Sequence, residues 1–260
     1  MPGFAANLSM LFTEVPFLAR FEAAAKAGFH AVEFLFPYHY NVDDIRQELH
    51  RNHLQLALFN VSPGDYANGE RGLAVLPGRE KAFENAVRQA LYYAQRLECK
   101  KLHVMSGITP ASLSLDEATA LWLSNMRLAA DMMAEQDTML LCEALNPRDV
   151  PGYFLHDQYQ TDGLVRMIGR PNARLQLDLY HAQIAQGDLS ILIRSLAQRI
   201  GHVQIASVPD RHEPDQGEIN YAYIFNELKK AGYEDWIGCE YHPRSGTQAG
   251  LSWRKLFDEQ

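Results

Sequence analysis

Four oxygen-bearing side chains stand at or near the ends of short apolar segments in the second half of the chain. They are Glu143 after MLLC, Asp178 after LQL, Gln204 within HVQIASV and Glu240 after WIGC. A carboxylate at the end of an apolar run is costly to bury unless it is paired or coordinated to a metal. Carboxylate and amide oxygens suit a hard divalent cation, Mg²⁺ or Mn²⁺, better than zinc or copper. If the four segments end at one place, their side chains can bind one such cation.

The elements that must position these side chains are visible as a repeating pattern. Eight short apolar segments, each with the length of a buried parallel strand, cover residues 4–10, 31–36, 54–61, 101–107, 139–145, 175–181, 202–208 and 236–241. Amphipathic segments of helical periodicity lie between them, for example at 16–28, 79–97, 117–136 and 221–232. Gly28 and Gly232 stand where helices are expected to end, and Asn220 is a suitable N-cap.

Eight alternations of strand and helix in 260 residues predict one (β/α)8 TIM barrel domain over residues 1–260. The alternative is a doubly wound open sheet, but neither of its two best-known phosphate-binding motifs follows any apolar segment. In a barrel the carboxyl ends of the strands meet at one mouth, which is where catalytic groups are found. The stretches NVSPGDYANGERG and SVPDRHEPDQGE follow the third and seventh segments, so both are expected as loops at that mouth.

Composition excludes several classes of protein. The chain is 47% hydrophobic and 22% charged, which is typical of a globular protein, and its net charge of −8 argues against nucleic acid as a partner. Three widely spaced cysteines indicate neither a disulfide framework nor a zinc finger. The first residues lack the features of an export signal, and no apolar run approaches 18 residues. We therefore expect a cytoplasmic protein without a membrane segment.

The sequence resembles the hydroxypyruvate isomerase family of xylose isomerase-like barrels, including its 2-oxo-tetronate isomerase branch. Segments such as GFHAVEFLFPY, PGDYANGERG, QLDLYHAQ, PDRHEPDQGEINY and GYEDWIGCEY carry the resemblance along nearly the whole chain. KLHVMSG and DRHEPD are nearer to the tetronate branch. The resemblance implies that Glu143, Asp178, Gln204 and Glu240 hold one Mg²⁺ or Mn²⁺, and that Glu143 and Glu240 are the acid and base.

Related ketose epimerases imply further contacts with substrate oxygens. A histidine three residues after the metal-binding aspartate corresponds to His181, and an arginine beyond the strand-seven ligand corresponds to Arg211. The neighbouring His212 competes with Arg211 for this role, because the length of the loop can shift the register. Arg211 offers a bidentate fork for the carboxylate of a small anionic hydroxy-oxo acid. His103 is a further candidate for contact with substrate, although a histidine late in a strand more often has a structural role.

Other residues leave alternatives open. Glu33 is expected either near the mouth or in a pair beneath it, and Cys142 and Cys239 are expected to face away from the metal. The aromatic residues at 34, 36, 38 and 40 can line a pocket, pack in the core or form the interface of a homo-oligomer.

The expected reaction is an isomerisation through an enediolate, with hydroxypyruvate or a 2-oxo-tetronate as substrate. A ketose 3-epimerase is the main alternative, but it would act on neutral sugars and would gain nothing from a carboxylate-binding arginine. An abasic-site endonuclease would need more metal-binding histidines and a basic groove, which the net charge opposes. A catalytically inactive sugar-binding barrel is disfavoured because all four ligand-type residues are present.

Overall fold

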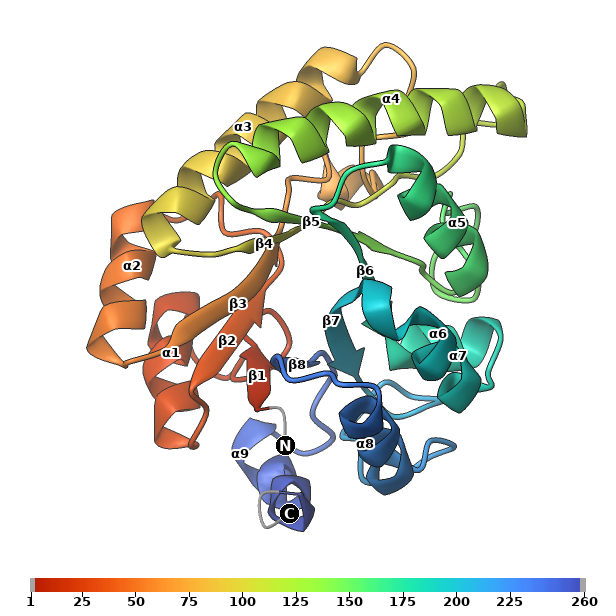
Figure 1. Cartoon of the computed structure of the whole chain (residues 1–260). Helices are drawn as coiled ribbons and strands as arrows, with labels where there is room; N and C mark the ends of the chain where they lie inside the picture. Colours follow the sequence, from red (N-terminus) through yellow and green to blue (C-terminus); the bar gives the residue numbers. More distant parts are fainter. Residues whose placement is uncertain (1–2, 258–260) are drawn as a thin grey trace.

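The computed structural model describes residues 3–257, and the strands in this range form one closed barrel that Figure 1 shows along its axis. The strands are β1 (Phe4–Asn7), β2 (Ala31–Phe34), β3 (Gln55–Asn60), β4 (Lys101–His103), β5 (Met139–Glu143), β6 (Ala173–Asp178), β7 (Ile200–Ile205) and β8 (Ile237–Cys239). Each strand pairs in parallel with the next, and β8 closes the barrel against β1 through the pair Ala5 and Gly238. The predicted (β/α)8 barrel is confirmed, and the open-sheet alternative is wrong.

Helices surround the strands on the outside of the barrel (Figure 1). They are α1 (Phe17–Lys26), α2 (Val42–Arg51), α3 (Glu80–Leu97), α4 (Leu115–Ala134), α5 (Gln158–Ile168), α6 (Leu179–Ala185), α7 (Leu189–Leu196), α8 (Tyr221–Lys230) and α9 (Thr247–Gly250), with 3-10 turns η1 (Tyr66–Asn68), η2 (Ala197–Arg199) and η3 (Leu251–Leu256). The four helices expected from periodicity are confirmed as α1, α3, α4 and α8. None of the described helices is long and apolar enough to span a membrane.

The predicted helix ends are also confirmed. Gly28 and Gly232 follow α1 and α8 with φ angles of 80° and 79°, the left-handed conformation that glycine adopts at little cost. Asn220 caps α8, since its side chain accepts a hydrogen bond of 3.1 Å from the backbone N–H of Tyr223.

Most strands are shorter than the apolar segments that predict them, and in one case this moves a candidate residue. The segment 175–181 is expected as strand throughout, but β6 ends at Asp178 and α6 begins at the next residue. The Asp178 side chain accepts a hydrogen bond from the backbone N–H of Tyr180 (2.8 Å) and so caps this helix. His181 therefore lies in the first turn of a helix at the mouth.

The barrel interior changes from apolar to polar along its axis. Ala5, Ala31 and Ala57 form a small apolar cluster near the strand starts, against which Trp236 packs. Further along the strands the interior holds the buried polar side chains of Glu33 and His202. Large apolar side chains fill the space between strands and helices. This outer layer is the hydrophobic core that stabilises the fold, and the barrel interior near the mouth can therefore hold polar groups.

The loop after β3 is fixed to the loop after β4. Gly72 forms an isolated β-bridge with Ser106, and its backbone N–H donates to the carbonyl of Pro63 at 3.0 Å. Gly72 has a φ of 122°, and a Cβ at this position would lie 2.2 Å from the backbone oxygen of Met105. Only glycine permits this close approach, which holds the β3 loop over the mouth.

We expect Gly72→Ala to lower the free energy of unfolding by about 3 kcal/mol, because the new Cβ collides with backbone and the φ angle is strained. Gly78→Ala is the matched control, since Gly78 also has a positive φ (75°) but would bring its Cβ within 4 Å of nothing. That variant should lose only about 1 kcal/mol. Urea unfolding followed by circular dichroism measures both, and equal losses would show that the loop contact at Gly72 is unimportant.

Candidate active site

A cavity of about 100 Å³ opens at the mouth of the barrel, where the strands end. Its charged and titratable lining includes Arg71, His103, Glu143, His181, Arg211 and Glu240. These side chains come from the β3 and β7 loops, from the ends of β4, β5 and β8, and from the first turn of α6. The two loops predicted at the mouth are therefore both there.

Three carboxylates converge at this cavity. Glu143, Asp178 and Glu240 are 4%, 0% and 6% exposed, so water screens their mutual repulsion poorly. Burial raises the pKa of Glu143 well above its usual value, and the charges of Glu240 and Asp178 raise it further. Burial also raises the pKa of Glu240 to about 8 and raises that of Asp178, although Arg211 opposes both shifts.

Arg211 lies between two of these carboxylates. Its Nη2 donates to Glu240 Oε2 at 2.6 Å and to Asp178 Oδ2 at 3.2 Å, and its guanidinium lies 4.8 Å from the centre of the Tyr180 ring. The competing residue His212 is directed elsewhere, because its Nδ1 lies 2.7 Å from the carbonyl oxygen of His242. Of the two candidates, the structure places Arg211 in the cavity.

His181 presents a hydrogen-bond donor to the site. Its Nδ1 accepts from the backbone N–H of Asn146 at 3.1 Å, and burial lowers the pKa of the ring well below its usual value. A neutral imidazole whose Nδ1 accepts must carry its proton on Nε2. That Nε2 lies 3.7 Å from Asp178 Oδ2. The ring is thus arranged to donate to an oxygen in the cavity and is poorly suited to bind a metal through Nε2.

His103 lies beside Glu143, with 3.5 Å between His103 Nε2 and Glu143 Oε2. Burial lowers the pKa of His103 to about 3, so the ring is neutral. Neither ring nitrogen has a hydrogen-bond partner among residues 3–257. The expectation of a histidine satisfied by structural hydrogen bonds is therefore not met, and the residue lines the cavity.

The donor set fits a hard divalent cation. Glu143, Asp178 and His181 offer atoms that all lie within 4.8 Å of one another, and Glu143 Oε1 has no hydrogen-bond partner in the described part of the chain. Because His181 Nε2 carries a proton, the carboxylate oxygens are the ligands that fit. Gln204 pairs with Asp178 in the sheet register, and its Oε1 accepts from Gln176 Nε2 at 2.6 Å.

Glu33 lies inside the barrel, where it orients Gln204 and Asn7. Of the two alternatives that its sequence position left open, it therefore forms a pair beneath the mouth. Its carboxylate accepts from Gln204 Nε2 (2.7 Å) and Asn7 Nδ2 (3.0 Å), and it lies 2.7 Å from His202 Nε2. A Cβ on Gly238 would lie 2.3 Å from Glu33 Oε2, so a larger residue there would force the Glu33 carboxylate to move. Asn7 also donates to Glu240 Oε1 at 3.3 Å, which links the network to the site.

Sequence reasoning missed two kinds of residue at the site. Arg71, Tyr66 and Asn60 line the cavity from the β3 loop and the end of β3, although only the loop as a whole was expected there. Asn7 closes β1 and contacts both Glu33 and Glu240. The signal that could have found it is a polar side chain within the first apolar segment, 4–10.

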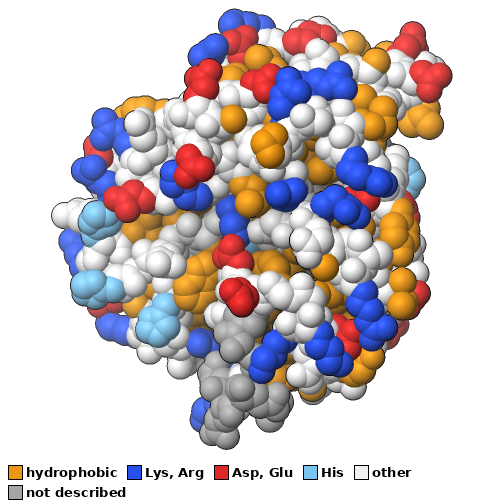
Figure 2. All heavy atoms as spheres, in the orientation of Figure 1, with side chains coloured by type: hydrophobic (Ala, Val, Ile, Leu, Met, Phe, Trp, Pro, Cys, Tyr) orange, Lys and Arg blue, Asp and Glu red, His pale blue; other side chains and the backbone are white. Residues whose placement is uncertain are grey.

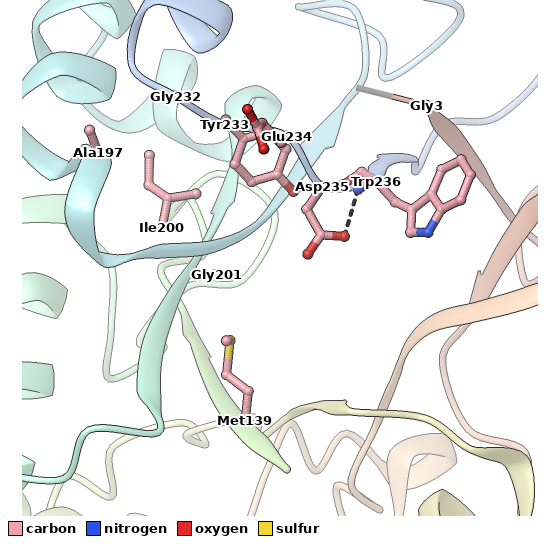
Figure 3. Close-up of a pocket in the computed structure, with 10 residues that line it drawn as sticks. All are labelled: Gly3, Met139, Ala197, Ile200, Gly201, Gly232, Tyr233, Glu234, Asp235 and Trp236. Carbon is pink, nitrogen blue, oxygen red and sulfur yellow. Dashed lines mark hydrogen bonds between the residues drawn. The ribbon is translucent and has the colours of Figure 1, made fainter. Parts of the chain in front are cut away.

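A larger cavity, about 550 Å³, lies at the opposite end of the barrel, around the first residues of β5 and β7 and the approach to β8 (Figure 3). Asp235 is one of its two carboxylates, and it pairs with Lys101 and accepts from the backbone N–H of Trp236 at 2.7 Å. No histidine or cysteine is among the residues that line it. Its volume exceeds that of the mouth cavity, but the groups able to move protons or bind a metal together are at the mouth.

The chain matches the family described as xylose isomerase-like TIM barrel over residues 21–257. It is 49% identical to a 2-oxo-tetronate isomerase from Cupriavidus necator, an alignment that covers 99% of each chain. It is 45% identical to the hydroxypyruvate isomerase of Escherichia coli, over 97% of this chain and 98% of the relative.

Solved structures share the fold of this chain. A crystal structure from Brucella melitensis, described as an AP endonuclease of family 2, superposes with a TM-score of 0.97 at 52% identity and covers 99% of each chain. The D-psicose 3-epimerase of Clostridium cellulolyticum superposes with a TM-score of 0.79 at 15% identity, which shows the shared fold alone. The chain therefore belongs to the xylose isomerase-like TIM barrel family and, within it, to the hydroxypyruvate isomerase group that its sequence motifs resemble.

Proposed function

We propose that this isomerase acts on 2-oxo-tetronate, moving the carbonyl group from C2 to C3, with hydroxypyruvate as a second substrate. Full-length relatives with 49% and 45% identity bear the names of these two activities. The observation that carries the proposal is that two buried carboxylates, Glu143 and Glu240, line one small cavity. Such a pair can remove a proton from one carbon and return one to its neighbour.

The reaction needs two proton transfers at carbon and a means to stabilise negative charge. The proton on C3 is removed, the electrons form an enediolate, the hydroxyl proton on O3 passes to O2, and a proton is delivered to C2. Glu143 at the end of β5 and Glu240 just after β8 serve as base and acid. The His181 Nε2–H donates to a substrate oxygen, where charge develops. Arg211 holds the Glu240 carboxylate in place through its 2.6 Å contact.

The proposal includes one Mg²⁺ or Mn²⁺. Glu143, Asp178, Gln204 and Glu240 would hold it. The carboxylates gathered at the mouth support this, as does Glu143 Oε1, which has no hydrogen-bond partner among residues 3–257. When bound, the cation supplies positive charge that stabilises the developing negative oxygen of the substrate. Gln204 would contribute its amide oxygen, which also accepts from Gln176 Nε2, since Glu33 engages the amide nitrogen.

Other activities of similar barrels are less well supported. The net charge of −8 disfavours nucleic acid as a partner. On the face shown in Figure 2, Lys and Arg side chains are scattered among Asp and Glu. A cavity of about 100 Å³ also suits a three- or four-carbon acid better than an extruded nucleotide. A ketose 3-epimerase has support only from the fold.

Proton NMR in D₂O tests the proposal directly. The full chain is incubated with Mg²⁺ or Mn²⁺ and, separately, with 2-oxo-tetronate, hydroxypyruvate and a ketose. The proposal predicts 3-oxo-tetronate as product, with solvent deuterium incorporated at the carbon that receives the proton. If the ketose incorporates deuterium and neither oxo acid does, the enzyme is instead an epimerase.

We expect Glu240→Gln to lower turnover by roughly 10²–10⁴-fold, because the amide keeps the size of the side chain and loses its ability to transfer a proton. The control is Glu234→Gln, which removes an exposed carboxylate at the far end of the barrel. Steady-state assays with 2-oxo-tetronate measure both variants. Near-wild-type turnover of Glu240→Gln would remove this residue from the mechanism.

Two substitutions at Glu33 test its role as an acceptor. Glu33→Gln should cost about 1 kcal/mol of unfolding free energy, since its oxygen still serves Asn7 and Gln204 while its amide can donate to His202. His202 can accept because its Nδ1 has no partner in the described residues and is free to take the proton. Glu33→Leu should cost roughly 3 kcal/mol or more, because several buried donors lose their acceptor. Equal losses in urea unfolding would contradict this assignment.

A further inference from the structure

We infer that Arg71 binds the carboxylate group of the substrate. This inference rests on the proposed function. If it holds, Arg71 is the residue that selects acids over neutral sugars. Arg71 lies on the loop between β3 and α3 and lines the same cavity as Glu143 and Arg211. The cavity thus has two arginines, one from the β3 loop and one from the β7 loop. Their surroundings differ in a way that assigns them different roles.

Arg211 is already neutralised by protein carboxylates. Its Nη2 contacts both Glu240 and Asp178, at 2.6 and 3.2 Å. A substrate carboxylate placed at this guanidinium would be repelled by both of them, and by Glu143 close by. Arg211, the arginine that sequence similarity indicates for substrate binding, is therefore best suited to orient the acid/base residue Glu240.

Arg71 has no carboxylate within ion-pair distance among residues 3–257. Its Nη1 donates to the backbone carbonyls of Tyr66 and Glu70, both at 3.0 Å, and its guanidinium lies 4.0 Å from the centre of the Tyr66 ring. These contacts hold the guanidinium without cancelling its charge. Its Nε and Nη2 remain free of protein acceptors in this range, and together they form the edge that binds a carboxylate with two parallel hydrogen bonds.

The acidic residues nearest in the loop are committed elsewhere. The Glu70 carboxylate pairs with Arg79 and accepts from the backbone N–H of Asp65 at 2.6 Å. Asp65 in turn accepts from the Asn68 side chain at 2.7 Å. The loop therefore satisfies its own acids internally and leaves the charge of Arg71 available to an anion.

The backbone around Arg71 is fixed in advance of binding. The next residue, Gly72, forms a β-bridge with Ser106, three residues beyond His103. The Tyr66 ring that supports the guanidinium packs against Phe36, with ring centres 5.2 Å apart. A cation held this way loses little conformational entropy on binding, which makes it an effective anchor.

Arg71→Met and Arg71→Lys test the inference. Calorimetry measures binding of erythronate, a four-carbon hydroxy acid without a carbonyl to isomerise, and of erythritol, its neutral counterpart. Arg71→Met should weaken erythronate binding about 10- to 100-fold, the effect of losing a charged hydrogen-bonding partner, and leave erythritol binding unchanged. KM for 2-oxo-tetronate should rise by a similar factor with a smaller change in kcat. Arg71→Lys should restore part of the affinity, because it keeps the charge without the fork.

Arg96→Met provides the matched control. Arg96 also lies over a tyrosine ring, 5.0 Å from the centre of Tyr92, but it is on α3 and does not line the cavity. This variant should bind erythronate as the wild type does. Wild-type erythronate affinity in a folded Arg71→Met variant would overturn the inference while leaving the isomerase intact. A wild type that neither converts oxo acids nor prefers erythronate to erythritol would overturn the proposed function itself.

Discussion

Three carboxylates crowded at one end of a barrel are the constraint on which the rest of the structure depends. Glu143, Asp178 and Glu240 are almost fully buried, and burial, followed by the charges of Glu240 and Asp178, raises the pKa of Glu143 well above its usual value. Arg211 compensates only part of this charge. A fold keeps such an unfavourable cluster only if other interactions hold it in place, and a barrel of paired strands supplies that rigidity.

The surrounding residues hold the three carboxylates and their neighbours in place. Asp178 is held by capping α6, and Glu240 by Arg211 and Asn7. Glu33 fixes the Gln204 amide from below, and Gly238 is small enough to leave it room. The polar axis of the barrel is thus a support for the mouth, and its cost is offset by the apolar layer between strands and helices.

Much of this arrangement was predictable from the sequence. Eight strand-length apolar runs predict the barrel, and the barrel brings carboxylates at strand ends to one mouth. The helix α6 was harder to recognise. It begins directly at the end of β6, so the apolar run continues from strand into helix. Arg71 could not be singled out, since the direction of a loop side chain depends on distant contacts such as the bridge from Gly72 to Ser106. The choice of Arg211 over His212 likewise depends on a local backbone turn, in which Arg211 has a φ of 56°.

Equilibrium titration of the metal-free protein with Mn²⁺ tests the central claim most directly, namely that the carboxylates gather at the mouth to bind one divalent cation. The account predicts a single saturable site per chain in calorimetry, with a binding isotherm that is lost when Asp178 is replaced by Asn and Glu143 by Gln in the same protein. A folded wild-type chain that shows no saturable binding, or a double variant that binds as well as the wild type, would contradict it.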